Sequence, residues 1–253
     1  MGHLFRIVRS SAWLLLWGSL AVQSASAQSA QYPPTDEEWD GTSYRALVQR
    51  VEDQGLPLPT LSDAATKPVF ERMVNTGNIP LRMGLNRALS VTIRFQRLDS
   101  ALPAIHKLVV LYSKEMQKGK PYASELARLM VYESKVSAAL LDLGEPYLST
   151  LAADKRYQVH VAYLDQVKSG ARQLYSGLVQ GMTETRLYSK SDILEMIGAA
   201  LAALPSYHPI LNEQDRQGLV QKLARQISTT TDQQLKTALT ELRDMLEHRR
   251  LPT

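Results

Sequence analysis

The chain has 253 residues, no cysteine, and 29 lysines and arginines against 25 aspartates and glutamates. The absence of cysteine excludes disulfide frameworks, thiolate metal sites and covalent haem attachment. Hydrophobic residues make up 44% of the chain and charged residues 21%, which excludes a disordered protein and leaves material for one large or two small folded domains.

Residues 1–27 have the pattern of a secretory signal peptide. Arg6 and Arg9 give a positive start, residues 12–22 are apolar, and residues 25–27 (Ala-Ser-Ala) are the small residues of a cleavage site. The apolar run is too short to span a bilayer as a helix. A cysteine-free exported chain fits a bacterial periplasm or exterior better than a small eukaryotic module. We therefore predict a periplasmic or secreted bacterial protein, with no transmembrane segment after leader cleavage.

The basic residues are spread along the chain. The two arginines of the leader account for half of the net charge of +4. Apart from the short tail at residues 248–250, no basic cluster remains, and phosphate backbones attract proteins through such clusters. The charge pattern therefore predicts no nucleic-acid partner.

Helical periodicity dominates the mature chain, although its first part is polar. Residues 28–42 include two prolines and an acidic run, and we expect a flexible segment that Trp39 attaches to the body. From Tyr44 onward, apolar residues recur at intervals of three and four positions, and Gly55 is placed to end this helix. A short helix is expected over residues 68–77.

Residues 89–96 alternate between apolar and polar types, which is typical of a β-strand. The chain has no second alternating run, and a single strand would leave its backbone groups without partners. As part of a helix over residues 80–100, the same residues are apolar on more than one side. We favour a central helix contacted by two neighbours and keep the strand as the alternative.

The next predicted helix is capped by Ser100 and ends at Gly119. Two further long helices follow it. One covers residues 126–143. The other covers residues 154–186 and would be about 50 Å long. Gly170, Gly177 and Gly181 fall on one side of this longest helix, which predicts close approach of a neighbour, with exposed glycines as the alternative.

Three shorter helices complete the chain. The first ends at Pro205, the second is capped by Asn212, and the third begins at Thr231. Their similar lengths are typical of stacked helical repeats, although no motif recurs at a fixed spacing. We predict an all-α protein over residues 43–253, a single-domain antiparallel helical bundle of about seven helices, with a repeat-like C-terminal part as an alternative.

Motifs of common enzymes and metal sites are missing from the sequence. It has no Glu-x-x-His pair of di-iron bundles, no His-Glu-x-x-His zinc motif, no nucleophile elbow and no glycine-rich phosphate loop. We therefore predict no catalytic residue, no cofactor and no metal ligand.

Glu133-Ser134 and residues 177–180 (Gly-Leu-Val-Gln) resemble two motifs of lytic transglycosylases, which are helical enzymes of the bacterial periplasm. The resemblance implies that Glu133 is a general acid in a cleft. The sequence departs from the family pattern, because the gap between the motifs is much wider. The periodicity places Glu133 on a packing stripe instead of facing a cleft.

Charges on apolar stripes predict a structural ion pair. Glu133 and Lys168 each lie in the middle of such a stripe, and a buried charge needs a partner. If the two helices form an antiparallel hairpin about a connection at residues 148–153, the two residues lie level, and we predict that they pair. The alternative is that Lys168 extends outward and Glu133 pairs with another base such as Arg94 or Arg97.

The end of the longest helix carries a second candidate site. Glu184, Arg186 and Tyr188 form a polar cluster that is either a binding patch or a solvated helix end.

These observations leave two classes of function. The first is a soluble exported protein of the bacterial cell envelope, non-enzymatic, that binds or scaffolds another protein or an envelope component. The second is an envelope enzyme, such as a cell-wall-acting hydrolase or lyase, whose site is assembled from separated residues. A deep pocket with two or more acids or histidines would favour the enzyme, and a flat or grooved apolar patch the binding protein.

Overall fold

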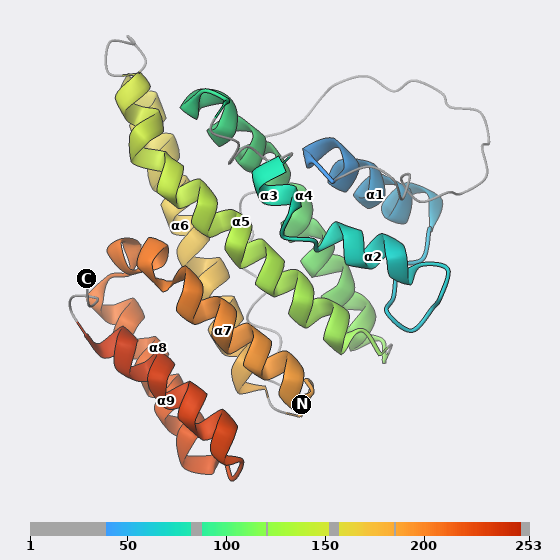
Figure 1. The fold of residues 1–253 in the computed structure, drawn as a ribbon, viewed down its shortest axis with the longest axis vertical. Coiled ribbons are helices and arrows are strands. Elements are labelled where there is room, and N and C mark those ends of the chain that lie inside the picture. The colour runs from blue at the N-terminus through green and yellow to red at the C-terminus, as the bar shows by residue number, and fades with distance from the viewer. Residues whose placement is uncertain (1–38, 82–87, 120, 152–156, 185, 249–253) are drawn as a thin grey trace.

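The structure is a computed structural model that describes residues 39–81, 88–119, 121–151, 157–184 and 186–248, and these residues form only helices and connections (Figure 1). The predicted all-α class is confirmed. Within the described residues there are nine α-helices and one short 3-10 helix, where about seven helices were expected. The elements are α1 (Gly41–Gln54), α2 (Lys67–Met73), α3 (Asn78–Leu81), α4 (Val91–Gln117), α5 (Ala123–Thr150), α6 (Tyr157–Thr183), α7 (Lys190–Tyr207), η3 (His208–Ile210), α8 (Glu213–Thr229) and α9 (Gln233–Glu247).

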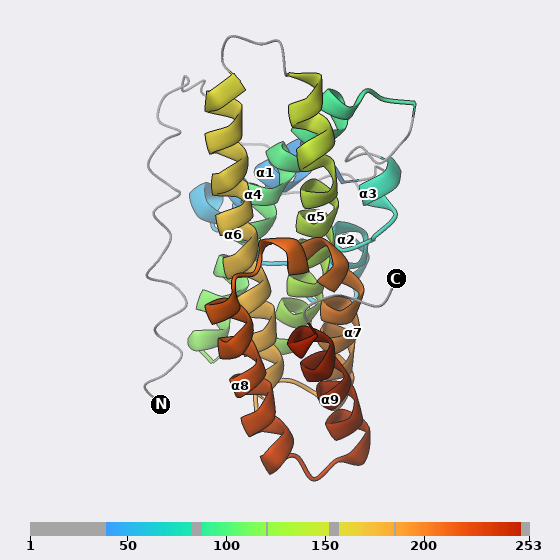
Figure 2. The ribbon, with the colours of Figure 1, turned by 90° about the vertical axis from the view of Figure 1, so that its left-hand side faces the viewer.

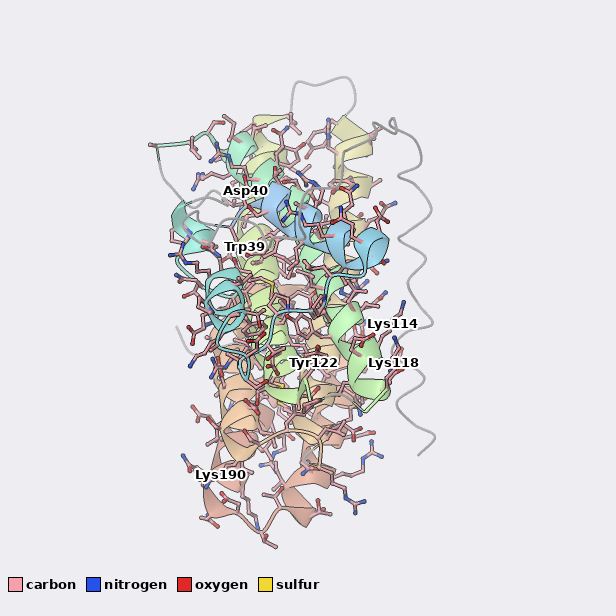
Figure 3. All side chains as sticks on the ribbon, turned by 90° about the vertical axis from the view of Figure 1, so that its right-hand side faces the viewer. Trp39, Asp40, Lys114, Lys118, Tyr122 and Lys190 are labelled. Carbon is pink, nitrogen blue, oxygen red and sulfur yellow. The ribbon has the colours of Figure 1, made fainter. Side chains whose placement is uncertain are left out.

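The described chain begins with a buried anchor and a capped helix (Figure 3). Trp39 is 1% exposed and its ring centroid lies 5.2 Å from that of Tyr44, as expected for a residue that attaches the preceding segment. The Asp40 carboxylate accepts hydrogen bonds from two backbone N–H groups of the first turn of α1. Gly55 ends α1 with a φ of 66°, the left-handed conformation that glycine adopts readily. The predicted leader and residues 28–38 lie outside the described residues.

Residues 91–96 form the first turns of α4, so the preference for a helix over a strand is confirmed, although residues 88–90 are not helical and the predicted start at residue 80 is wrong for this helix. Ser90 caps α4, because its Oγ accepts a hydrogen bond from the backbone N–H of Ile93 at 3.3 Å. The predicted cap at Ser100 is wrong: α4 continues through this position, and the Ser100 hydroxyl donates to the carbonyl of Arg97 at 2.9 Å. Phe95 provides the tertiary contact that outweighs the strand-like pattern, since it stacks on Tyr147 of α5 with ring centroids 4.2 Å apart.

Helices α4, α5 and α6 are antiparallel neighbours. Between α4 and α5, Phe95 meets Tyr147, and the early part of one helix therefore lies beside the late part of the other. Between α5 and α6, Gly144 lies against Leu164 and Gly181 lies against Met130. Helix α5 therefore lies at the centre of the molecule, in contact with both α4 and α6 (Figure 1).

Helix α7 runs parallel to α5. Near their N-terminal ends, Ser124 Oγ donates to the Asp192 carboxylate at 2.9 Å. Further along, the Tyr207 hydroxyl donates to the carbonyl of Ser134 at 3.3 Å. The hairpin of α6 and α7 therefore repeats the orientation of the hairpin of α4 and α5.

The last hairpin, α8 and α9, continues the same arrangement (Figure 2). Lys190 at the start of α7 pairs with Asp232 at the start of α9, with Nζ 2.7 Å from Oδ2. Helix α9 is therefore parallel to α7, and α8 contacts α6 in the neighbouring layer. The result is three antiparallel hairpins placed side by side, an arrangement typical of helical repeats that already begins at α4.

Of three predicted helix boundaries in the C-terminal part, one agrees with the structure and two differ. Pro205 does not end its helix, because α7 continues through it to Tyr207. Asn212 does cap α8, where Asp215 completes a capping box. The last helix is capped by Asp232, one residue after the predicted start, through its contact with the backbone N–H of Leu235 at 3.1 Å.

Among the described helices, the stretch Lys190–Ile210 is the one that is long and apolar enough to cross a membrane by length and composition. In the structure its larger apolar residues face the core, where α7 contacts α5, α6 and α9. The absence of a membrane-spanning segment in the mature chain stays a prediction.

Candidate functional site

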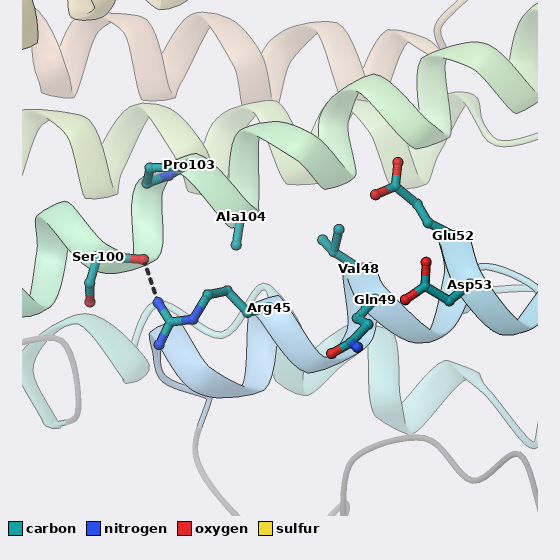
Figure 4. A pocket seen from close by; sticks show the side chains of 8 residues that line it. All are labelled: Arg45, Val48, Gln49, Glu52, Asp53, Ser100, Pro103 and Ala104. Atoms are coloured by element: carbon teal, nitrogen blue, oxygen red, sulfur yellow. Dashed lines mark hydrogen bonds between the residues drawn. The ribbon is translucent and has the colours of Figure 1, made fainter. Parts of the chain in front are cut away.

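A shallow groove runs along the surface where α1 packs beside α4 (Figure 4). Its volume is about 430 Å³, within the range of small-ligand sites. Its lining consists of Arg45, Val48, Gln49, Glu52 and Asp53 from α1 and Ser100, Pro103 and Ala104 from α4.

The groove exists because α1 and α4 approach closely at one end and carry small residues further along. A Cβ atom on Gly41 would lie 2.9 Å from Ser100 Oγ, so the start of α1 needs glycine to reach α4. Beyond this contact, α4 presents Pro103 and Ala104, whose short side chains leave space beside α1.

Two polar contacts between the helices bracket the groove. At one end, Arg45 Nη1 donates to the carbonyl of Ser100 at 2.9 Å. At the other end, Lys107 Nζ lies 2.8 Å from Glu52 Oε1. The floor between them is apolar and contains Val48.

The two ends of the groove carry opposite charge. The Arg45 guanidinium lies at one end, and the carboxylates of Glu52 and Asp53 lie at the other (Figure 4). Lys107 neutralises Glu52, whereas the exposed Asp53 carboxylate has no hydrogen bond or ion pair with any residue in the described part of the chain. The groove is therefore a dipolar site over an apolar floor.

A second polar cluster joins α4, α5 and α7 inside the bundle. His106 Nδ1 lies 2.8 Å from Glu133 Oε1, and the side chains are 46% and 6% exposed, respectively. The hydrogen bond to Glu133 raises the pKa of His106 above its usual value, although partial burial acts in the opposite direction. Tyr207 is fully buried nearby, and burial raises its pKa further than the charge of Glu133 does.

A buried carboxylate that orients a half-exposed histidine is an arrangement found in general bases. Within the described residues, no group of three or more histidines, aspartates and glutamates is placed to hold a metal ion. The sequence prediction missed His106. A signal for it existed: a hairpin with its turn near Gly119 brings residue 106 level with about residue 133.

The predicted ion pair between Glu133 and Lys168 is wrong. Lys168 Nζ instead lies 2.9 Å from Glu145 Oε1, with its side chain 33% exposed. Glu133 does pair with another base, as the alternative held, but the base is His106 and not Arg94 or Arg97.

The register of the hairpin explains this error. Helix α5 continues through Pro146 to Thr150, so the connection between the helices begins later than the predicted residue 148. Because Gly144 faces Leu164, Glu133 lies level with a position about 10 Å beyond Lys168 along α6.

The residues of the predicted patch, Glu184, Arg186 and Tyr188, differ in exposure. Glu184 is half-buried and accepts a hydrogen bond from Gln180 Nε2 at 3.1 Å, and Arg186 is exposed. Tyr188 is 9% exposed, and burial raises its pKa to about 12. The three side chains therefore occupy different environments, and their role as a binding patch stays a prediction.

Of the two segments that resemble lytic transglycosylase motifs, Glu133-Ser134 lies near the middle of α5, and residues 177–180 lie near the C-terminal end of α6. The Glu133 carboxylate is held by His106, and the Gln180 amide by Glu184. Leu178 and Val179, the two central residues of the second segment, are buried in the core. No protein-family model, no curated protein and no solved structure matches this chain.

Proposed function

We propose that the protein is an exported, non-enzymatic binding or scaffolding protein of the bacterial cell envelope, and that it binds another protein or an envelope component in the groove between α1 and α4. The observation that supports this proposal is the dipolar lining of the groove. Arg45 lies at one end, Glu52 and Asp53 lie at the other, and Val48 and Ala104 lie between them. Polar groups placed around an apolar floor are typical of recognition sites.

The stacked hairpins support a scaffolding role. Arrays of helical hairpins present broad surfaces on which partners are held, and each hairpin contacts mainly its neighbours. Here α5, α7 and α9 form one layer and α6 and α8 belong to the other. Export is supported by the signal-peptide pattern at residues 1–27.

The proposal can be tested with a photo-crosslinking amino acid at Gln49, an exposed residue of the groove, in the full chain expressed in a bacterial host. The matched control carries the same amino acid at Gln221, an exposed residue of α8. We expect a discrete adduct in the envelope fraction from position 49 and none from position 221, and an N-terminus at Gln28 in the exported protein. Equal labelling from both positions, or retention of Met1 in the cytoplasm, would contradict the proposal.

The His106–Glu133 pair favours a second candidate function, an envelope enzyme such as a cell-wall-acting hydrolase or lyase. The half-exposed histidine would act as a base oriented by the buried Glu133. The test is the release of soluble fragments from purified bacterial cell wall. The enzyme candidate predicts release by the unchanged protein that is lost in both His106→Asn and Glu133→Gln. Absence of release by the unchanged protein would remove this candidate.

A further inference from the structure

We infer that the α1–α4 groove holds a short extended peptide segment with an acidic group at the Arg45 end and a basic group at the Asp53 end. This inference rests on the proposed function, because it names the occupant of the same groove. It follows from the length, the charges and the floor of the groove.

The length of the groove sets the length of the occupant. Arg45 and Asp53 are eight positions apart on α1, which corresponds to about 12 Å along the helix axis. An extended peptide rises about 3.3 Å per residue, so three to four residues span this distance. The opposite charges of the occupant are therefore expected about three positions apart.

Arg45 is held in place and keeps donors for a ligand. Its Nη1 donates to the carbonyl of Ser100, and its Nη2 donates to Thr42 Oγ1 at 3.3 Å. A guanidinium carries five N–H groups, so donors remain after these two bonds. Because arginine binds carboxylates through paired N–H groups, the acidic group of the occupant belongs at this end.

The other end of the groove attracts a cation. Glu52 is already neutralised by Lys107, whose side chain is 26% exposed. The next carboxylate, Asp53, faces solvent at the rim, where an incoming ammonium or guanidinium group finds a partner. Exposed ion pairs of this kind are weak and sensitive to salt, which predicts a reversible complex.

The floor selects small apolar residues in the middle of the segment. Val48 and Ala104 lie between the charged ends, with Pro103 beside them (Figure 4). Successive side chains of an extended chain point to opposite sides. One of the two central residues therefore faces the floor, where a methyl or isopropyl group fits the shallow space.

The experiment titrates the full exported protein with three blocked tetrapeptides and follows the methyl signals of Val48 and Ala104 by NMR. The probe is acetyl-Glu-Val-Ala-Lys-amide, and the controls replace its Lys with Glu or its Glu with Lys. We expect the mixed-charge peptide to bind about threefold to fivefold more tightly than either control, and its advantage to fall at high salt.

Charge reversal provides the sharper test. Asp53→Lys should turn the preference toward the peptide with two acids, and Arg45→Glu toward the peptide with two bases. The matched controls are Glu241→Lys on α9 and Arg225→Glu on α8, which make similar charge changes at exposed residues and should leave the preference unchanged. All four positions are exposed, so the variants should fold, which circular dichroism checks.

Equal binding of the three peptides, or a preference that the reversals at Arg45 and Asp53 do not change, would overturn the inference. Its failure is distinguishable from failure of the proposed function. An adduct from position 49 combined with no peptide preference keeps the groove as the binding site and rejects the mixed-charge occupant.

Discussion

The side chain of Leu164 on α6 lies directly against Gly144 on α5, so that a Cβ atom on Gly144 would come within 2.8 Å of Leu164 Cδ1. Leu164 is 1% exposed and has little space to move. This contact sets how closely α5 and α6 approach and which residues lie level along them. It therefore also determines that Glu133 and Lys168 do not meet.

Replacing Gly144 with alanine tests this close approach. The added methyl group overpacks the site, which destabilises by about 1–3 kcal/mol, while the gain in helix propensity returns about 1 kcal/mol. The matched control is Gly177→Ala on α6, where the added Cβ meets no atom within 4 Å and only the gain remains. In urea unfolding, we expect Gly144→Ala to be less stable than Gly177→Ala by about 1–3 kcal/mol. Equal stability of the two variants would contradict the close packing.

The same comparison shows what glycine spacing predicts and what it does not. Gly181 does mark a close approach, since its Cβ would lie 3.2 Å from Met130 Cε, whereas Gly177 faces open space. The helical periodicity places Gly177 and Gly181 on one side of α6. The space beside each glycine, however, depends on which side chain of the neighbouring helix lies opposite it. Gly144 could not be recognised from α5 alone, because the need for glycine arises from Leu164 on the next helix.

The His106–Glu133 pair predicts a stability that depends on pH. The pKa of His106 is raised in the folded protein, so the charged histidine is favoured by folding. Its contribution is complete below about pH 6.5, the unfolded pKa, and is lost as the pH rises through the folded pKa. We therefore expect the difference in unfolding free energy between the unchanged protein and His106→Gln to be larger at pH 6 than at pH 8.5.

NMR titration of the His106 ring checks the cause. The pKa should be above 6.5 in the unchanged protein and should fall in Glu133→Gln, because the carboxylate that favours the charged ring is removed. An unchanged titration of His106 in Glu133→Gln would show that the hydrogen bond does not set its pKa.

The Asp192 carboxylate connects the start of α7 to α5. Its removal should lower the free energy of unfolding by more than the removal of a capping carboxylate at the surface does. The carboxylate is 5% exposed and accepts hydrogen bonds from Ser189 Oγ at 2.7 Å and from Ser124 Oγ at 2.9 Å. Asp192→Ala leaves these donors without their acceptor and weakens the capping box, for a loss of about 2–3 kcal/mol.

Asp215→Ala is the matched control for this variant. Asp215 occupies the same position of the capping box of α8, but it is only partly buried and its hydrogen bonds stay within that box. We expect it to lose about 1 kcal/mol or less in the same unfolding measurement. Equal losses for the two alanine variants would mean that the contact with Ser124 adds no stability.

The periodic sequence pattern was sufficient for the helices but not for their ends. Apolar spacing identified the long helices, and Gly55 and Asn212 were recognised as helix termini from local chemistry alone. Pro205 and Ser100 were misleading, since packing keeps both residues inside helices. A proline removes a single hydrogen bond, and the contacts of a buried helix can outweigh that loss.

The groove could not be predicted because it depends on two helices that are far apart in the chain. The lining residues of α1 have an ordinary solvent-facing pattern, and nothing local indicates that Arg45 reaches the carbonyl of Ser100. The charge on the stripe of α5 was recognised correctly, because Glu133 is buried and does have a partner. To identify the partner of Glu133, the register between α5 and α6 has to be known. An error of a few residues in the position of the connection shifts this register by about two helical turns.

Buried tyrosines predict a loss of stability in alkali. Burial raises the pKa of Tyr132 to about 12, ahead of the opposing effect of its hydrogen bond with Tyr44, and burial likewise raises the pKa of Tyr188 to about 12. Because a raised pKa in the folded protein favours the neutral phenol, the contribution of these tyrosines to the stability of the folded state is complete below about pH 10. It is lost as the pH rises toward 12. Absorbance at 295 nm should show some of the 11 tyrosines ionising near pH 10 and the others only at higher pH, together with loss of helical circular dichroism. Ionisation of all tyrosines in one step near pH 10, with the helix content retained, would contradict this account of the core.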